Sequence, residues 1–193
     1  MEAELLDLIS AQHGHFRLES GHHGNQWLDL DSLFLRPAVL LPFASDLARR
    51  LAAHRVDAIV GPLVGGAFVA QMVAVELDLP FAFAERLADA HGVTYRIPDA
   101  LHDPLRGKAV AIVDDAINAG SATRATYAAL KSLGARPVAV GALLILGDTA
   151  RPFFEANDLA VESIARLAND LWEPASCPLC AAGVPLSTPS DAG

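Results

Sequence analysis

The chain has 193 residues, of which 52% are hydrophobic, and a formal net charge of −9. A chain of this length and apolar content can bury the core of one domain, and its acidic excess argues against a surface for the nucleic-acid backbone. No apolar stretch reaches the ~20 residues that a membrane-spanning helix needs, and the acidic N-terminus does not resemble a signal peptide. We therefore expect one cytoplasmic domain that binds neither a membrane nor nucleic acid.

The middle of the chain alternates between helical and strand patterns. Leu40, Phe43, Leu47 and Leu51 recur at helical spacing, and the apolar run 56–60 follows them. The later elements are, in order, a helix, two strands, a helix and a strand, at residues 67–77, 79–84, 109–113, 122–133 and 138–146. This alternation predicts an α/β fold, doubly wound, with a mainly parallel sheet and right-handed crossovers.

The first expected strand runs into a glycine-rich loop, Gly61-Pro-Leu-Val-Gly-Gly66. In an open α/β sheet, ligands bind beyond the carboxyl ends of the strands, where this loop lies. Glycines there let backbone N–H groups approach an anion closely. An ordinary tight turn from strand to helix is the other interpretation of the same residues.

The segment 85–107 is polar and shows no regular hydrophobic pattern. Long irregular segments beside a ligand site often cover it. We expect a mobile loop over the site here.

The strongest motif begins at the strand 109–113, which runs directly into Asp114 and Asp115. Two adjacent carboxylates at a strand end are suited to bind hydroxyl groups or a metal. The following residues 118–123 supply a glycine, hydroxyl side chains and free backbone N–H groups at a helix start, which suit a phosphate. The motif therefore predicts a site for a phosphorylated ribose, although an acid pair that merely caps the helix is an alternative.

Other phosphate-binding motifs do not match this stretch. A Walker A loop needs a lysine after its second glycine, whereas Ser121 follows Gly120. The dinucleotide fingerprint G-x-G-x-x-G does not occur in the chain.

Residues 109–123 resemble the phosphoribosyl diphosphate (PRPP) signature of the type I phosphoribosyltransferases. The resemblance implies that Asp114 and Asp115 bind the ribose hydroxyls and that Leu63, Val64, Gly65 and Gly66 lie nearest the pyrophosphate. It also implies a loop for the 5′-phosphate, formed by Asn118, Ala119, Gly120, Ser121, Ala122 and Thr123.

The ends of the chain resemble the orotate phosphoribosyltransferase branch of this family. His15-Phe16-Arg17-Leu18-Glu19-Ser20-Gly21 is similar to its F-x-L-K-S-G segment, and residues 177–186 are similar to its closing C-P-L-C-x-x-G-x-P-L. The resemblance implies an enzyme that transfers the phosphoribosyl group from PRPP to a nucleobase, with orotate the first choice. It further implies Mg²⁺ bound with PRPP and a homodimer whose catalytic hood reaches the neighbouring site.

Several positions depart from the pattern of that branch. Glu19 stands where a lysine is usual, and the hood lysine is absent, which leaves Arg86 and His91 as catalytic candidates and Arg96 as an alternative cation. The arginine that pairs with the orotate carboxylate has Arg151 as its nearest equivalent. Phe16 is the candidate for stacking on the base, or else a core residue.

The resemblance divides the single domain into parts. Residues 1–36 form a small hood on the base side, residues 37–150 the PRPP-binding core and residues 151–186 the C-terminal elements, whereas residues 187–193 are expected to be disordered.

The histidines and cysteines match no metal-site spacing. His13, His15, His22 and His23 lie close together, and Cys177 and Cys180 form a single C-x-x-C. Structural zinc needs four ligands, so we expect no zinc here and two reduced thiols in a proline-rich turn. The sequence thus predicts no metal other than Mg²⁺.

Three alternatives to orotate transfer stay open. The unusual Glu19 and the missing arginine are compatible with a purine or another pyrimidine as the base. The absent hood lysine is compatible with a regulatory protein that senses PRPP without turnover. A plain nucleotide-binding module is the third, and it would not need the loop 61–66.

Overall fold

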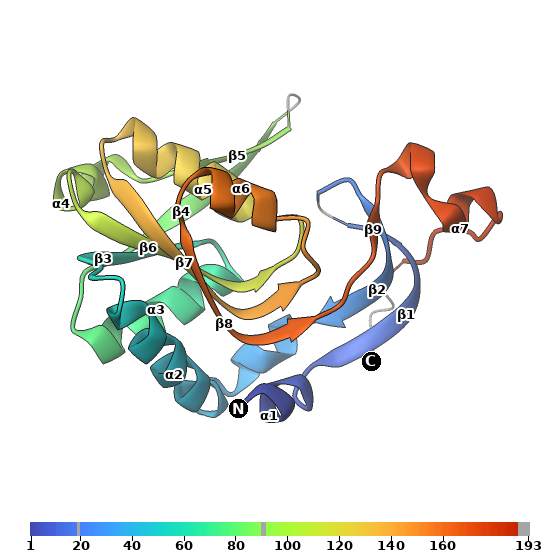
Figure 1. Cartoon of the computed structure of the whole chain (residues 1–193), viewed down its shortest axis with the longest axis horizontal. Coiled ribbons are helices and arrows are strands. Elements are labelled where there is room, and N and C mark those ends of the chain that lie inside the picture. Colours follow the sequence, from blue (N-terminus) through green and yellow to red (C-terminus); the bar gives the residue numbers. More distant parts are fainter. Residues whose placement is uncertain (19, 90–91, 189–193) are drawn as a thin grey trace.

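The computed structural model describes residues 1–18, 20–89 and 92–188 and shows two sheets (Figure 1). The strands are β1 (Ser10–Arg17), β2 (His23–Asp29), β3 (Ala58–Pro62), β4 (Phe81–Asp89), β5 (Gly92–Arg96), β6 (Ala109–Ile117), β7 (Arg136–Leu146), β8 (Ala160–Leu167) and β9 (Leu171–Trp172). The helices are α1 (Glu2–Leu6), α2 (Leu41–Ala52), α3 (Gly65–Leu77), α4 (His102–Leu105), α5 (Ser121–Ser132), α6 (Arg151–Ala156) and α7 (Pro178–Ala181). Short 3₁₀ turns lie at Asp31–Leu35, Pro37–Val39, Asp99–Leu101 and Pro174–Ser176.

The larger sheet has the order β5-β4-β3-β6-β7-β8 among the described residues. All neighbouring strands in it are parallel except β4 and β5, which form an antiparallel edge. This arrangement confirms the doubly wound, mainly parallel sheet that the alternating pattern predicts. Strand β6 lies at the centre, between β3 and β7, and it extends past the expected end at residue 113 to include the acid pair.

The helices cover both faces of this sheet (Figure 1). On one face α2 and α3 pack against Ala111 and Val113 of β6, and on the other Leu130 of α5 packs against Val110 and Ile112. Successive side chains of a strand point to opposite faces, so a strand that is apolar throughout, as β6 is up to Val113, serves two cores at once. Burial on both faces makes β6 a rigid base for the residues that follow.

The smaller sheet has the order β1-β2-β9 and is antiparallel. It joins the two ends of the chain, because β9 and α7 come from the last part of the sequence and lie beside the hairpin of β1 and β2 (Figure 1). The hairpin belongs to the segment 1–36 that the sequence assigns to a base-side hood. Ser187 also contacts it, through a backbone N–H that donates to the His15 carbonyl at 2.6 Å. Of the predicted disordered tail 187–193, Ser187 and Thr188 are described and residues 189–193 lie outside the described residues.

The segment 85–107 is more regular than its composition predicts. Residues up to Asp89 extend β4, β5 pairs back onto it, and Ile97 and Leu105 are buried in the core. The expectation of an irregular segment is therefore wrong for the described part. Cross-strand pairing satisfies the backbone of polar residues, a contribution that a hydrophobic pattern does not reveal.

No helix in the described ranges is both long and apolar enough to cross a membrane.

Candidate active site

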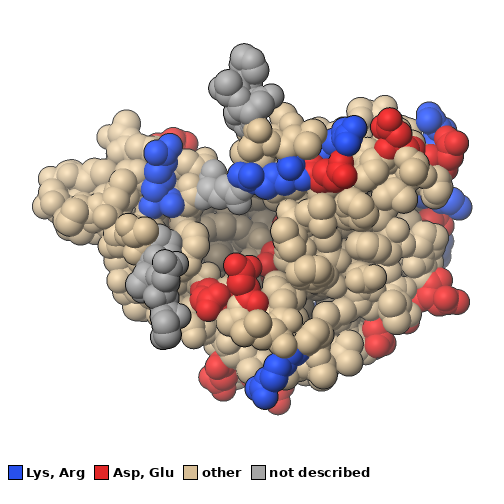
Figure 2. Space-filling model, turned by 180° about the vertical axis from the view of Figure 1, so that it is seen from behind, with Lys and Arg blue, Asp and Glu red and all other residues tan. Residues whose placement is uncertain are grey.

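A cavity of about 340 Å³ lies at the carboxyl ends of β3 and β6, beneath the hairpin of β1 and β2. Both predicted anion-binding loops line it. Its walls include, from these loops, Leu63, Val64, Gly65, Gly66, Asp114, Asp115, Asn118, Ala119, Gly120, Ser121, Ala122 and Thr123. The space-filling view shows a hollow on the rear face, with acidic side chains beside it (Figure 2). The fold thus brings two segments fifty residues apart in sequence into one pocket.

Asp114 and Asp115 lie side by side on the wall of this cavity. An oxygen of Asp114 accepts the backbone N–H of Asp115 at 3.1 Å, and its other oxygen accepts the Thr123 hydroxyl at 3.5 Å. Burial raises the pKa of Asp114 well above its ordinary value, and the adjacent charge of Asp115 raises it further. Burial also raises the pKa of Asp115. The pair is therefore a confined source of negative charge that favours a cation or hydroxyl donors.

The glycines of the first loop lie directly against these acids. A methyl group on Gly65 would overlap the Asp115 carboxylate, and one on Gly66 would overlap that of Asp114 and the ring of Pro62. The peptide bond between Leu63 and Val64 in this loop is cis. Only glycine allows the backbone to come this close, so the two loops form one continuous surface.

The second loop turns into α5 at Gly120, whose φ of 76° lies in the left-handed region. A residue without Cβ adopts that conformation at little cost, and α5 then begins at Ser121 with its N-terminus at the cavity. The loop is tied to the strand β8 side of the pocket, because Asn169 Nδ2 donates to Asn118 Oδ1 at 3.1 Å. Asn169 itself lines the cavity, and the sequence pattern gives no indication of this.

Trp27, not Phe16, is the aromatic ring of the small sheet that lines the cavity. Phe16 is 2% exposed and packs behind, with its ring centroid 6.2 Å from that of Trp27. β1 has a register irregularity between His13 and Phe16, so strict alternation of faces does not hold there. Further lining residues that the sequence did not single out are Ser20, Gln26, Leu28 and Tyr95.

Arg151 does not line the cavity. It is exposed at the start of α6, and its Nε donates to Glu155 at 2.7 Å. Arg124 is closer, because it borders a second hollow that shares Ser20, Ala119 and Ser121 with the main cavity. The Arg124 guanidinium lies 5.2 Å above the Phe153 ring and donates to the Thr149 carbonyl at 3.2 Å. Its Nε is buried and hydrogen-bonds to no described residue.

The predicted hood cations lie on the antiparallel hairpin of β4 and β5. Arg86 is opposite Tyr95 in the register, and Glu85 is opposite Arg96. Directly opposite residues share a face of the hairpin, so Arg86 is on the face of Tyr95, which lines the cavity. Arg96 is on the other face and donates to Glu85 at 2.8 Å. His91 lies outside the described residues, as does Glu19.

The histidines and cysteines are not separate features. His15, His23, Cys177 and Cys180 lie together between the hairpin and the C-terminal segment, within metal-ligating distance of one another. Both cysteines are free thiols, as expected, but their contacts with His15 and His23 were not predicted from the sequence. The four residues form two pairs more than 150 residues apart, and no spacing pattern in the sequence connects such distant pairs.

A doubly wound sheet with an acid pair, a helix N-terminus and a glycine loop around one cavity defines a protein of the type I phosphoribosyltransferase fold. The sequence model described as the phosphoribosyl transferase domain matches residues 43–165, and the chain belongs to this family.

The relatives agree with this assignment. An orotate phosphoribosyltransferase from Thermotoga maritima is 30% identical over 194 residues, covering 100% of this chain and 99% of its own length. The crystal structure of orotate phosphoribosyltransferase from Aeropyrum pernix gives a TM-score of 0.66 at 24% identity and covers 81% of this chain and 88% of that one. Adenine phosphoribosyltransferase from Thermoanaerobacter pseudethanolicus gives 0.68 at 18% identity, covering 86% and 99%. Since both structures fit the fold, the fold does not determine the base.

Proposed function

We propose that this protein is an orotate phosphoribosyltransferase. It transfers the 5-phosphoribosyl group from PRPP to a ring nitrogen of orotate and releases pyrophosphate. The observation that carries the proposal is the shared cavity, in which the acid pair meets both anion-binding loops. The relative from Thermotoga maritima, matched over the full chain, supports orotate as the base.

The chemistry follows from the charges around the cavity. The bond from the anomeric carbon to pyrophosphate breaks, the leaving group takes the electron pair, and the ring nitrogen of the base forms the new bond and loses its proton to solvent. Positive charge builds on the ribose in between, and the carboxylates of Asp114 and Asp115 favour that charge while they bind the ribose hydroxyls. The amides of the loops 63–66 and 118–123 bind pyrophosphate and the 5′-phosphate, so no protein nucleophile is needed.

The residues present fit Mg²⁺ as the cofactor. Asp114 and Asp115 offer hard oxygen ligands. Burial disfavours their ionised forms and raises the pKa of both carboxyl groups, and a bound cation would favour the ionised forms again. When bound with PRPP, Mg²⁺ supplies charge neutralisation for the pyrophosphate oxygens.

Arg124 is our candidate for the orotate carboxylate. Within the described lining of the main cavity there is no arginine or lysine, and Arg124 stands at its border. Phe153 and Thr149 orient its guanidinium, which borders the second hollow. A carboxylate is bound best by such an oriented planar cation.

Arg86 is our candidate for the hood cation that attracts pyrophosphate. It shares a hairpin face with Tyr95, which lines the cavity, whereas Arg96 lies on the other face. Closure of the hairpin over the cavity keeps water from the ribosyl centre.

A homodimer in which the hood serves the neighbouring site, and a cytoplasmic location, belong to the same proposal.

The test is a steady-state assay with PRPP, Mg²⁺ and a panel of orotate, uracil, adenine and hypoxanthine, measuring pyrophosphate and nucleotide. Among these four bases, only orotate is expected to give turnover. Turnover only with another base would overturn orotate as the substrate and leave the transferase in place. PRPP binding without pyrophosphate release for any base would favour a sensor. The control is the double variant Asp114→Asn with Asp115→Asn, which is expected to lose PRPP binding. It checks that the assay reports on this site.

A further inference from the structure

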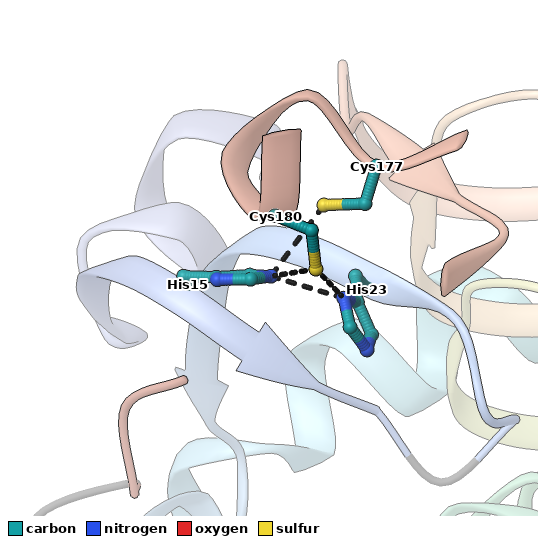
Figure 3. A group of neighbouring side chains, drawn as sticks. All are labelled: His15, His23, Cys177 and Cys180. Carbon is teal, nitrogen blue, oxygen red and sulfur yellow. Dashed lines mark hydrogen bonds between the residues drawn. The ribbon is translucent and has the colours of Figure 1, made fainter. Parts of the chain in front are cut away.

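Four side chains that bind metals well meet where the C-terminal segment crosses the hairpin of β1 and β2 (Figure 3). His15 comes from β1, His23 from the first position of β2, Cys177 from the N-cap of α7 and Cys180 from within α7. The side chains point toward a common centre (Figure 3). Their ligand atoms all lie within 4.8 Å of one another.

Four of the six separations between the ligand atoms are close to the edges of a zinc tetrahedron. Zn–N bonds of about 2.0–2.1 Å and Zn–S bonds of about 2.3 Å place neighbouring ligand atoms about 3.3–3.8 Å apart. His15 Nε2 lies 3.0 Å from His23 Nδ1 and 3.4 Å from Cys177 Sγ. Cys180 Sγ lies 3.3 Å from His23 Nδ1 and 3.7 Å from His15 Nε2. These are four of the six separations, and the two that involve Cys177 Sγ with His23 Nδ1 and Cys180 Sγ are no longer than 4.8 Å.

A backbone contact orients the His15 ring for this role. His15 Nδ1 lies 2.7 Å from the Val184 carbonyl oxygen, and since a carbonyl only accepts, Nδ1 carries the hydrogen. In the neutral ring the lone pair is then on Nε2, the atom that faces the cluster. A ligating histidine that donates its other N–H to a carbonyl is the usual second layer of a zinc site.

Hydrogen bonding alone does not account for the arrangement. The single lone pair of His15 Nε2 faces three groups at once, namely His23 Nδ1, Cys177 Sγ and Cys180 Sγ. One lone pair accepts one good hydrogen bond. His15 and Cys177 are 1% and 2% exposed, so water does not satisfy the remaining groups well. A shared cation would satisfy all four atoms.

We propose that His15, His23, Cys177 and Cys180 bind one Zn²⁺ in a closed tetrahedral site. Two thiolates and two imidazoles suit zinc better than Mg²⁺, which prefers oxygen ligands. With four protein ligands there is no open coordination position, so the ion is structural and takes no part in the transfer reaction. Cys180 is exposed and gives the ion a route of entry.

The site would fasten the base-side hood. The turn between the two histidines carries Leu18 and Ser20, both of which line the cavity. The small sheet has little core of its own, because β9 contributes only two residues to it. Zinc would cross-link the C-terminal segment to the hairpin and so stabilise the part of the cavity wall that Leu18 and Ser20 form. The zinc site itself stands independently of the proposed orotate activity.

The first experiment measures zinc by elemental analysis in the full chain, purified without a histidine tag. Wild type is expected to carry close to one zinc per chain, and Cys180→Ser and His23→Gln to lose most of it. The matched control is His13→Gln, an exposed histidine of the same strand, which should keep wild-type zinc. Wild type without zinc after incubation with ZnCl₂, equal loss in the control, or an intact mass showing a disulfide between Cys177 and Cys180 would each overturn the proposal.

The second experiment needs no variant and so does not depend on a variant's folding. Zinc is removed from wild type with a chelator and Co²⁺ is added. Visible bands of tetrahedral cobalt and a thiolate charge-transfer band in the near ultraviolet are expected, with saturation at one equivalent. The thermal midpoint should fall on chelation and return on adding Zn²⁺. Octahedral cobalt spectra without thiolate absorption would contradict the proposed ligand set.

Discussion

A side chain on Gly66 would occupy the space of the Asp114 carboxylate, because the glycine backbone lies directly against that group. The proposed pyrophosphate loop and the proposed ribose-binding acids are therefore in direct contact.

Gly66→Ala is expected to lower kcat/KM by about 100-fold or more, since a displacement of about 1 Å in a reacting geometry costs this much. The measurement is steady-state kinetics at saturating base. The control is Gly107→Ala, which strains a left-handed residue (φ 74°) with open space around it, before the amino end of β6. Equal kinetic losses in both variants would mean that Gly66 acts only through general stability.

Asp114→Asn is expected to raise the thermal midpoint of the ligand-free protein at neutral pH while it abolishes PRPP binding. Burial raises the folded-state pKa of Asp114, so the folded state binds this proton more tightly than the unfolded state. The protein is then stabilised by the proton at acid pH and loses that stability as the pH rises through the raised pKa. Asparagine removes the charge, and a gain of about 1 kcal/mol would raise the midpoint by about 2–4 °C.

Thermal scans across pH check this sign. The difference between Asp114→Asn and wild type should shrink as the pH falls below the raised pKa, where both side chains are neutral. Asp103→Asn, at a side chain that is 96% exposed, is the control and should show no such trend. A variant that is less stable than wild type at neutral pH would contradict the burial argument.

Trp27 should report and support base binding. Trp27→Ala is expected to raise the KM for the base about 10-fold, because stacking on an aromatic ring contributes ~1–3 kcal/mol. Phe16→Leu, behind it in the core, should lower the thermal midpoint and leave that KM near wild type. Fluorescence gives a second measurement. In the variant Trp172→Phe, Trp27 is the one remaining tryptophan of the chain, so a fluorescence change on base binding should persist in this variant. If the change were lost, Trp172 would be the responding ring.

Arg124→Gln should raise the KM for orotate about 10- to 100-fold, the loss expected when a charged hydrogen bond of ~1.5–3 kcal/mol is removed. The KM for PRPP should change little. Arg151→Gln is the matched control, because that arginine is exposed and paired with Glu155. A larger effect on PRPP than on orotate would assign Arg124 to the phosphate instead.

Arg86→Gln should lower kcat by about 100-fold, as expected for removal of one group that stabilises developing charge. Arg96→Gln is the comparison within the same hairpin, since its partner is Glu85 on the opposite face. Both rates follow from a pyrophosphate-release assay. If Arg96→Gln were the slower variant, the assignment of hairpin faces to roles would be reversed.

That the acid pair and both loops line one cavity could be predicted from the sequence because the parts of this candidate site are local. Strand β6 is apolar up to Val113 and carboxylates follow, so the position of Asp114 at the carboxyl end is given by chain order alone. The parallel sheet then places the loop 61–66 at the same edge. No long-range contact had to be known for these residues.

The roles of other residues depended on contacts that local patterns do not contain. The register irregularity in β1 puts Phe16 in the core and leaves Trp27 at the cavity. Arg124 is one helical position beyond the phosphate loop, and only its neighbours Phe153 and Thr149 show which way its guanidinium points. Cross-strand pairing likewise separates Arg86 from Arg96.

By itself, then, the sequence determined the parallel sheet and the acid-and-glycine cavity, since strand burial and chain direction fix which ends of the strands meet. Only the tertiary structure decided which side chains of the small sheet line the cavity and the meeting of His15 and His23 with Cys177 and Cys180. The physical reason is sequence distance, because His15 and Cys177 are 162 residues apart and meet through the packing of both chain ends on one small sheet.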